Sequence, residues 1–425
     1  MTEPTAFLCA AFRTGQKKPY INGFFYFTKI FFMPDKLLVD LFQAYYDARR
    51  YKRNTMSALN FEINLEHNIF ELYKELKNNA YQISPSLAFI IFDPVQREII
   101  ASPFRDRVVH HLVFNYINPI LEKLFINDSY SCRQGKGISY GVKRVAHFVR
   151  SSSQNYQTDN YILKLDISGY FMSINQAILY DKVENYLLRN GTNYSFDLKL
   201  VLALLKKIVF HDYIKDCVIR GGRTNWQKLP RNKSLFFTPP GFGLPIGNLT
   251  SQLFSNVYLN DFDHFIKRTL KFKYYGRYVD DLIIIDGNKE KLKKTIILIA
   301  EYLSTNLNLK IHPRKIYLQP YVKGVNFLGG IVKPHRIYVR HRTKTSFYRS
   351  ATKANNVLKN SEIEKKALRK ILSSFNSYLG VLGQYKTHNL RRKILTNKLS
   401  SNFRRHYRLG SGKFKYKKII LKKNL

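Results

Sequence analysis

Negatively charged residues are scarce in this sequence. Asp and Glu together number 29, against 71 Lys and Arg, so the formal net charge is +42 at pH 7. A small domain needs a net charge of only about 2 to 8 to stay in solution. The excess therefore favours a polyanionic partner. A protein that only bound a membrane surface would instead concentrate its positive charge on one amphipathic helix.

Cysteine and long apolar runs are scarce as well. The three cysteines, which include no CxxC pair, are Cys9, Cys132 and Cys217. This pattern predicts neither a zinc site nor a disulfide framework, and it fits a reducing, cytoplasmic location. The apolar stretch from Gly23 to Met33 is interrupted by Lys29 and is too short to span a bilayer. No small-residue cleavage site follows it, so residues 1–32 are interpreted as an N-terminal extension of unknown role.

Apolar and aromatic side chains, by contrast, are abundant. Hydrophobic residues make up 45% of the 425 residues, and aromatic residues 15%. A chain of this length and composition can build two or three packed units, which excludes a wholly disordered protein. The 30 Tyr and 31 Phe are spread among the basic residues. Aromatic faces beside cations are typical of channels that bind nucleic acid.

The hydrophobic pattern alternates between helices and strands. Helical spacing is found over Pro34–Tyr81, Asp106–Leu124 and Leu249–Leu270. Strands are predicted over Ser86–Ala101 (a pair around the turn Asp93-Pro94), Tyr161–Ile167 and Tyr274–Ile285 (strand, turn and strand). This order favours an α/β or α+β sheet domain and excludes an all-helical bundle.

The composition changes after about Gly330. Beyond this point the only acids are Glu362 and Glu364, while Lys and Arg continue at high density. Helical spacing over Glu362–Leu399 predicts a separate basic, helical module. Residues 404–425 are interpreted as a charged tail that becomes ordered only on nucleic acid.

Two adjacent acids stand between apolar strands in Tyr278-Val279-Asp280-Asp281. Such a pair is costly to fold in a tight hairpin, because each carboxylate resists desolvation and repels its neighbour. A divalent cation removes this conflict, and an all-oxygen site suits Mg²⁺, which also binds substrate phosphates. The alternative is an ordinary Asp-Asp turn at a solvent-exposed end.

A third acid, Asp166, ends the apolar strand that begins at Tyr161. It precedes the acid pair by more than a hundred residues, a separation that neighbouring strands of one sheet can close. Three acids brought together in this way can hold two metal ions, which activate an attacking hydroxyl and stabilise a leaving pyrophosphate. The alternative for Asp166 alone is a cap on the following helix.

These segments together resemble the palm of reverse transcriptases, and the resemblance runs from about Met33 to about Leu399. It implies an RNA-directed DNA polymerase in which Asp166, Asp280 and Asp281 are catalytic and bind two Mg²⁺ ions, with Ile167 in the same metal site. The implied fold is an α+β right-hand polymerase with an antiparallel sheet in its palm. Its expected parts are the extension 1–32, fingers 33–160, a palm 161–333, a helical thumb 334–403 and the basic tail 404–425.

Four further residues take roles from the same resemblance. Phe171 is similar to the family's aromatic gate against the ribose 2′-hydroxyl, and Lys315 to its lysine near the pyrophosphate. Tyr278 and Gly329 are expected to contact nucleic acid, because Phe327-Leu328-Gly329-Gly330 resembles the primer-grip turn. The implied ligands are dNTPs, an RNA template and the DNA product duplex, and no membrane is implied.

The loop before Leu249 narrows the resemblance to a subfamily. It reads Ile246-Gly247-Asn248-Leu249-Thr250-Ser251-Gln252. This is similar to the IGxxxSQ variant of diversity-generating retroelements and differs from the QGxxxSP of most bacterial reverse transcriptases. The segments Phe104–His111, Ser129–Gly137 and Phe171–Ile174 are similar to the same subfamily. The resemblance implies error-prone copying of adenines in a non-coding, template-repeat RNA, with a small basic accessory protein as partner.

Four residues of this loop are candidate ligand contacts. Ile246 and Gly247 are expected to meet the incoming nucleotide, and Ser251 and Gln252 the nucleic acid. An isoleucine offers only apolar contact where glutamine can form a hydrogen bond, so discrimination against mispaired geometry should weaken. The alternative is that Ile246 only packs under the loop.

Triphosphate binding departs from the family pattern. The turn at Phe92-Asp93-Pro94 has no lysine, which leaves Arg97, with Arg133 and Lys136, to bind the triphosphate. Arg133 and Lys136 are also candidate nucleic-acid contacts. The GxG at residues 135–137, which contains Lys136 and follows Arg133, can cradle a phosphate together with these two side chains. A lone GxG is a weak signal.

Other polar residues have simpler interpretations. His110 and His111 have no partner at metal-ligand spacing and are expected to pack or to cap a helix. Trp226 and the segment Arg220–Lys233 are interpreted as a surface insertion.

Two other functions remain open. One is a reverse transcriptase of an antiphage defence system, which gene neighbourhood would distinguish from a retroelement enzyme. The other is an inactive RNA-binding module that retains the polymerase fold, and a primer-extension assay would decide it.

Overall fold

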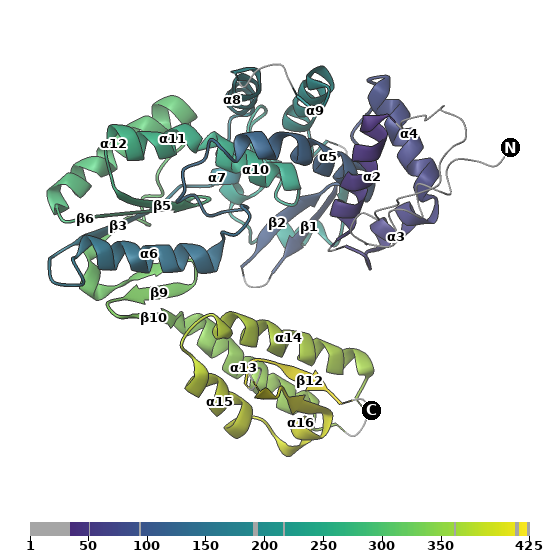
Figure 1. Cartoon of the computed structure of the whole chain (residues 1–425). Coiled ribbons are helices and arrows are strands. Elements are labelled where there is room, and N and C mark those ends of the chain that lie inside the picture. Colours follow the sequence, from purple (N-terminus) through teal and green to yellow (C-terminus); the bar gives the residue numbers. More distant parts are fainter. Residues whose placement is uncertain are drawn as a thin grey trace, which may run out of the picture. The chain divides into compact units, whose positions relative to one another are not determined.

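The computed structural model describes residues 35–50, 52–92, 95–189, 194–215, 217–360, 363–412 and 416–422. The expected extension 1–32 and the Asp93-Pro94 turn lie outside these ranges. Packing divides the chain into two compact units, each made of two separate stretches. Unit 1 consists of Met1–Leu124 and Phe171–Tyr258, and unit 2 of Phe125–Tyr170 and Leu259–Leu425. Helices and strands occur in both units, so the α+β prediction is confirmed (Figure 1).

Unit 1 combines a three-stranded sheet with helices. Strands β1 (Leu87–Ile91) and β2 (Arg97–Ala101) form the predicted antiparallel pair, and β4 (Val218–Ile219) joins β1 in parallel. Helix α5 packs against both α2 and α10. The α-helices are α2 (Lys36–Arg49), α3 (Met56–Ile63), α4 (Leu65–Lys77), α5 (Phe104–Leu121), α7 (Tyr170–Ser173, at the unit boundary), α8 (Gln176–Arg189), α9 (Leu198–Phe210) and α10 (Leu249–Tyr258). Short 3₁₀ turns are η1 (Arg223–Trp226), η2 (Arg231–Lys233) and η3 (Leu235–Phe237).

Unit 2 is built on a four-stranded antiparallel sheet in the order β5-β6-β3-β7. The strands are β5 (Tyr274–Tyr278), β6 (Asp281–Asp286), β3 (Tyr161–Asp166) and β7 (Tyr317–Pro320). Figure 1 shows α6 (Ile138–Ser152) on one side of this sheet, and α11 (Asn260–His264) and α12 (Lys289–Leu307) on the other. A second sheet, ordered β10-β9-β8, consists of β8 (Val325–Phe327), β9 (Gly330–Lys333) and β10 (Arg336–Val339), preceded by η5 (Tyr321–Lys323).

Local sequence explains α12. The Asn288 side chain accepts a hydrogen bond from the Lys291 N–H at 2.9 Å, which caps the first turn. Its buried residues follow helical spacing: Leu292, Thr295, Ile299, Leu303 and Leu307. Asn308 ends the helix in the left-handed region, with φ 51°. The helix therefore has one apolar face, which it buries, and an exposed lysine-rich face.

The C-terminal part of unit 2 has its own hydrophobic core. Its elements are α13 (His341–Val357), α14 (Lys365–Gly383), α15 (His388–Asn397), α16 (Ser401–His406), β11 (Tyr407–Leu409) and β12 (Ile419–Leu421). The interpretation of residues 404–425 as a separate tail is wrong over the described part. Tyr407 and Ile419 are buried in this core, and the Asn376 side chain makes two hydrogen bonds to the Ile419 backbone, of 2.9 and 3.0 Å. The many charged residues of the segment suggested a tail, so its alternating apolar residues were not recognised as strands.

The long helix predicted over Leu249–Leu270 is also wrong. Helix α10 ends at Tyr258, α11 covers Asn260–His264, and η4 (Phe265–Thr269) is a turn of π-helix. Leu259 interrupts the series with φ −97° and ψ 6°. Since Leu259 is neither Gly nor Pro, the sequence carried no signal for this break. Within the described ranges, no helix combines the length and hydropathy that a bilayer-spanning segment needs.

Candidate active site

Strand register brings the three predicted acids to one end of the central sheet. β3 pairs with β6 so that Asp166 lies directly opposite Asp281. β5 pairs with β6 through a hairpin in which Tyr278 faces Asp281, so Asp280 lies in the connecting turn. Opposed Cα atoms in such a ladder are about 4.5–5.5 Å apart. The carboxylates from distant parts of the sequence therefore share one site in unit 2.

The turn that carries Asp280 is held in an unusual conformation. Val279 has φ 54°, in the left-handed region that a β-branched residue rarely adopts. Such strain costs on the order of 1–3 kcal/mol and persists only where the surroundings fix it. Arg277 Nη1 donates a hydrogen bond to the Val279 carbonyl at 3.1 Å. This guanidinium supports the turn from within the protein.

Arg277 is itself fixed by a buried ion pair. Its Nε and Nη2 donate to the two carboxylate oxygens of Asp263 at 2.7 Å each, and both side chains are fully buried. The Tyr275 hydroxyl donates to the same carboxylate at 2.6 Å. Helix α11 is thereby tied to the catalytic hairpin. Sequence reasoning missed Arg277 and Asp263, although an arginine inside an otherwise uncharged strand was a usable signal.

Lysines neutralise two of the three acids. Lys315 Nζ donates to both carboxylate oxygens of Asp166, at 2.8 and 2.9 Å. Lys164 Nζ lies 3.0 Å from Asp281 Oδ1. Strand alternation explains the second pair, because Lys164, Asp166 and Asp281 all project from one face of the β3–β6 ladder. Lys315 was predicted near this site; Lys164 was missed, although its place two residues before Asp166 indicated that face.

The third acid experiences the repulsion expected of crowded carboxylates. Burial, together with the negative charges of Asp166 and Asp281, raises the pKa of Asp280 to about 6. A positive charge brought to the site would favour the ionised form of Asp280. The hairpin is therefore not an ordinary exposed Asp-Asp turn.

The donor set fits a hard divalent cation. Carboxylate oxygens are the ligands that Mg²⁺ prefers, and two ammonium groups already supply positive charge here. Among the described residues, however, no three His, Cys, Asp or Glu side chains are arranged around one metal position. A bound cation would compete with Lys315 for both oxygens of Asp166 and with Lys164 for one oxygen of Asp281. Ile167, whose side chain is 1% exposed, can offer only its main-chain oxygen.

The other predicted nucleic-acid contacts of unit 2 lie in two turns and beside the acids. Arg133 Nη1 donates to the carbonyls of Ile126 and Ser129, at 2.6 and 2.9 Å, and Lys136 Nζ donates to Asn127. Both cations thus support the loop before them. Gly329, with φ 83°, forms the turn between β8 and β9. Half-buried Tyr278 ends β5 next to the catalytic turn.

In unit 1 the structure brings Phe171 and Ile246 to one apolar cluster. Both side chains are half-buried and pack against a core that includes Ile100 and Met172. The Ile246 carbonyl accepts a hydrogen bond from the Ile100 N–H at 2.9 Å. Gly247 follows with φ 144°, and an added Cβ would lie 2.7 Å from the Ile100 carbonyl oxygen, so only glycine fits.

Three more predicted contacts belong to unit 1. Arg97 is exposed at the start of β2, paired with Ile91. Ser251 is buried on α10, with 3% of its surface exposed, and Gln252 beside it is exposed. Gln252 can therefore reach a ligand more readily than Ser251.

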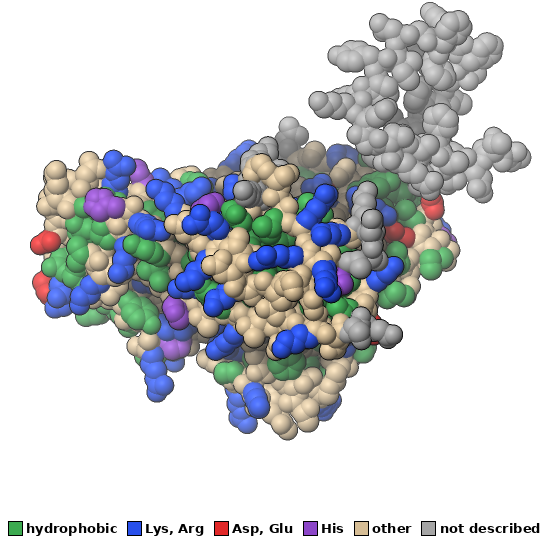
Figure 2. Space-filling model, turned by 90° about the horizontal axis from the view of Figure 1, so that it is seen from below, with side chains coloured by type: hydrophobic (Ala, Val, Ile, Leu, Met, Phe, Trp, Pro, Cys, Tyr) green, Lys and Arg blue, Asp and Glu red, His purple; other side chains and the backbone are tan. Residues whose placement is uncertain are grey.

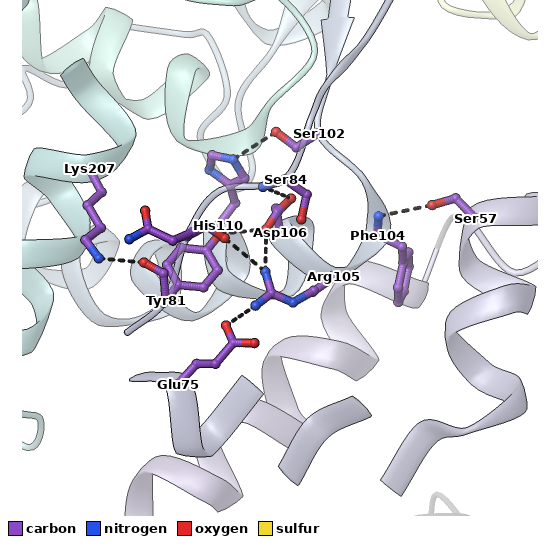
Figure 3. Close-up of polar contacts among 11 residues, drawn as sticks. Ser57, Glu75, Tyr81, Ser84, Ser102, Phe104, Arg105, Asp106, His110 and Lys207 are labelled. Atoms are coloured by element: carbon purple, nitrogen blue, oxygen red, sulfur yellow. Dashed lines mark hydrogen bonds and ion pairs between the residues drawn. The ribbon is translucent and has the colours of Figure 1, made fainter. Parts of the chain in front are cut away.

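The polar residues around Asp106 serve the structure of unit 1 (Figure 3). Asp106 accepts hydrogen bonds from the Tyr81 hydroxyl at 2.8 Å and the Ser84 N–H at 3.1 Å, and Arg105 links it to Glu75. Burial raises the pKa of Asp106. This network ties the segment before β1 to α4 and α5.

His110 has the packing role expected for it. Its ring nitrogens lie 3.2 Å from Ser102 Oγ and 2.8 Å from Thr250 Oγ1. Burial lowers the pKa of His110 to about 3, which keeps the ring neutral. The histidine thus connects α5 with α10.

The sequence of this chain matches the model of a known protein family. The sequence model of the family described as reverse transcriptase (RNA-dependent DNA polymerase) matches residues 95–332, more than half of the chain. No curated protein sequence matches significantly.

Solved structures of telomerase are similar to this chain at low identity. Telomerase from Candida albicans with a TWJ fragment of telomeric RNA gives a TM-score of 0.42 and 12% identity, covering 80% of this chain and 62% of that one. Apo telomerase from Candida tropicalis gives 0.44 and 13%, covering 76% and 60%. The chain thus spans about three fifths of the length of these telomerase chains.

The family match contains the strand that ends at Asp166, the hairpin with Asp280 and Asp281, and Lys315. This chain therefore belongs to the reverse transcriptase (RNA-dependent DNA polymerase) family.

Proposed function

We propose that this polymerase copies an RNA template into DNA with two Mg²⁺ ions held by Asp166, Asp280 and Asp281. The observation that carries the proposal is the convergence of these carboxylates with Lys315 at the end of the central sheet. When bound, the ions supply activation of the primer 3′-hydroxyl and neutralisation of the leaving pyrophosphate. The right-hand arrangement is fingers 33–160, palm 161–333 and thumb from 334 onward.

The chain's own residues have distinct tasks in this proposal. Lys315, once it leaves Asp166, presents its ammonium group to the triphosphate. Phe171 fills the space that a ribose 2′-hydroxyl would need, and Arg97 binds phosphate oxygens from the exposed start of β2. The ligands are dNTPs, an RNA template and the RNA·DNA product, and the cytoplasm is the expected location.

The finer proposal is error-prone copying in a diversity-generating retroelement, with a template-repeat RNA and a small basic accessory protein as partners. It is supported by Ile246, which packs against the same apolar core as Phe171. Where the side chain near an incoming base pair is apolar, no hydrogen bond distinguishes paired from mispaired geometry. Misincorporation is expected to be most frequent opposite template adenine.

Deep sequencing of cDNA tests both levels of this proposal. Wild type, Ile246→Gln and the size-matched control Ile246→Leu copy one defined RNA. We expect Ile246→Gln to lower the adenine error rate about tenfold, which corresponds to about 1.4 kcal/mol of added discrimination, and Ile246→Leu to leave it unchanged. Absence of cDNA from wild type would contradict the polymerase proposal. Accurate copying of adenine by wild type, unaffected by either substitution, would leave polymerase activity standing and favour the antiphage role.

A further inference from the structure

The segment after β4 carries unbalanced positive charge. We name residues 220–237 the basic loop. Its cations are all exposed: Arg220, Arg223, Lys228, Arg231 and Lys233. The sequence has no Asp or Glu from Cys217 to Asn260. Within the part of the chain that the structure describes, none of these five cations forms an ion pair.

The basic loop is anchored to the sheet of unit 1 by one buried acid. Glu98 on β2, with 2% of its surface exposed, accepts hydrogen bonds from Trp226 Nε1 at 2.7 Å, Ser234 Oγ at 2.5 Å and the Leu235 N–H at 2.6 Å. A buried carboxylate needs such donors to offset its lost hydration. The acid that contacts the loop thus fixes its conformation and does not face solvent. The interpretation of Trp226 as part of a plain surface insertion is therefore incomplete.

Two further contacts hold the first part of the basic loop. The Arg220 N–H donates to the Ala88 carbonyl at 2.9 Å, which continues the pairing of β4 with β1. Gln96 Nε2 donates to the Asn225 carbonyl at 2.8 Å. A loop fixed at this many points cannot spread to separate its charges. Their mutual repulsion is reduced by mobile ions and further by a bound polyanion.

An exposed aromatic ring lies among these cations. Phe237 is 52% exposed, and the Arg231 guanidinium lies over its ring at 5.2 Å from the centroid. Bases of single-stranded nucleic acid stack on such rings, while neighbouring cations bind the phosphates. A duplex keeps its bases stacked inside the helix and offers nothing to the ring. An exposed ring among exposed cations therefore favours binding of a single strand.

We propose that the basic loop binds single-stranded RNA, with phosphates at its cations and a base on Phe237. The inference deepens the proposed function and rests on it, because the strand would be the unpaired part of the RNA template. The site lies entirely within unit 1, whereas the three acids belong to unit 2.

A charge-matched pair of variants tests the proposal. The loop variant carries Arg223→Gln, Lys228→Gln and Lys233→Gln. The control carries Lys289→Gln, Lys293→Gln and Lys294→Gln on α12, where the three lysines are also exposed. Both variants lose the same net charge, and none of the six side chains is part of a core. Thermal unfolding should therefore match wild type in both.

Binding is measured by fluorescence anisotropy with a short unstructured RNA and with an RNA·DNA duplex of the same length, in EDTA and over a range of salt. We expect the loop variant to bind the single strand at least about tenfold more weakly, with a salt slope shallower by about 2, because each lost phosphate contact contributes about 0.7. The control should change by less than about threefold. Phe237→Ala should weaken single-strand binding about fivefold or more.

Equal weakening by the loop variant and the control would overturn the proposal, since total charge alone would then explain binding. Equal weakening for single strand and duplex would overturn the assignment to a single strand. Because EDTA prevents synthesis, these outcomes are independent of catalysis. A wild-type protein that binds through the loop but extends no primer would refute the proposed function and not the loop.

Discussion

The three acids of the site have different electrostatic surroundings. Asp166 and Asp281 each have a lysine ammonium group within about 3 Å, at 2.8 and 3.0 Å. Asp280 lies in the turn, where burial and its two acidic neighbours raise its pKa to about 6. Ionisation of Asp280 is therefore unfavourable in the metal-free protein.

Asp280→Asn should abolish primer extension and stabilise the metal-free protein. The folded pKa of about 6 lies above the ordinary value of 3.8, so the folded state binds the extra proton between these values. The stabilising contribution of the protonated Asp280 is fully present below pH 3.8 and is lost as the pH rises through 6. Replacing the acid removes a cost on the order of 3 kcal/mol at pH 8. Thermal unfolding with EDTA from pH 5 to 8 measures the difference in stability between wild type and variant. A difference that stays the same across that range would contradict the prediction.

Phe171→Ala should admit ribonucleotides. The half-buried ring is held by its cluster, and removing it opens the space in which we place the excluded 2′-hydroxyl. Incorporation of rNTP relative to dNTP is the measurement, and the expected rise is about tenfold or more, as for the loss of a steric contact of more than about 1.4 kcal/mol. Phe171→Tyr retains the ring and serves as control. If neither variant changes the ratio, the gate lies elsewhere.

At the scale of elements, the catalytic hairpin depends on the buried pair behind it. Arg277→Met alone leaves the Asp263 carboxylate buried without a counter-charge, which should cost about 3–5 kcal/mol of stability. Adding Asp263→Asn removes that charge and retains an acceptor for the Tyr275 hydroxyl. Stability should largely return in the double variant, while kcat stays at least about tenfold below wild type, because the strained Val279 turn has lost its donor.

A third substitution separates support of the turn from general packing. Val279→Gly removes the steric penalty of the left-handed conformation, about 1 kcal/mol or more. In the double variant it should restore part of kcat, and in wild type it should have little effect. Full kcat in the double variant, measured by primer extension beside thermal unfolding, would mean that the buried pair contributes to folding alone.

The last strand is a structural part of the C-terminal module. Ile419 is fully buried, so Ile419→Ala should lower the free energy of unfolding by about 2–5 kcal/mol. Deleting residues 404–425 should unfold the module instead of removing a tail. Lys418→Ala, next to it and exposed, is the control. Limited proteolysis and thermal unfolding report the effect, and a deletion variant with wild-type unfolding would contradict the assignment.

The sequence predicted elements well where periodicity and chemistry agreed. The strands next to Asp166 and Asp280 were predicted from their apolar residues and their acidic ends, because both signals lie within the strands' own sequence. Three features depended on distant partners and could not be read in the same way. Leu259 breaks a helix without a breaking residue, and Ile419 finds its partners on α14. The alternation of β3 could show which face Lys164 shares with Asp166, but its pairing with Asp281 depends on the register of β3 with β6.

Over the described part of the molecule, burial removes a larger share of the acids than of the Lys and Arg residues from the surface. Five acids are buried, each with at most 9% of its surface exposed: Glu98, Asp106, Asp128, Asp166 and Asp263. Figure 2 shows Lys and Arg side chains across the visible face and Asp or Glu only near its margins. On this face the positive field is therefore little offset by carboxylates.

This charge predicts steep salt dependence of binding to an RNA·DNA duplex. A protein that contacts six to ten phosphates loses about 10³- to 10⁵-fold in affinity between about 50 and 200 mM salt. Anisotropy titrations at several salt concentrations measure the slope of log K against log salt. A slope shallower than about −2 would show that few of the cations meet phosphate, whatever the net charge.

The two-stretch composition of unit 1 has a consequence for how the chain acquires its structure. His110 and Thr250 are in hydrogen-bond contact although 140 residues separate them, and the stretch between them includes residues 125–170 of the other unit. The helices of the first stretch cannot complete their core until the second stretch has been synthesised and the intervening loop has closed. Contacts of such long sequence separation slow folding. A nascent chain should therefore expose the faces of α5 that α10 later covers, and during that interval it is most vulnerable to aggregation.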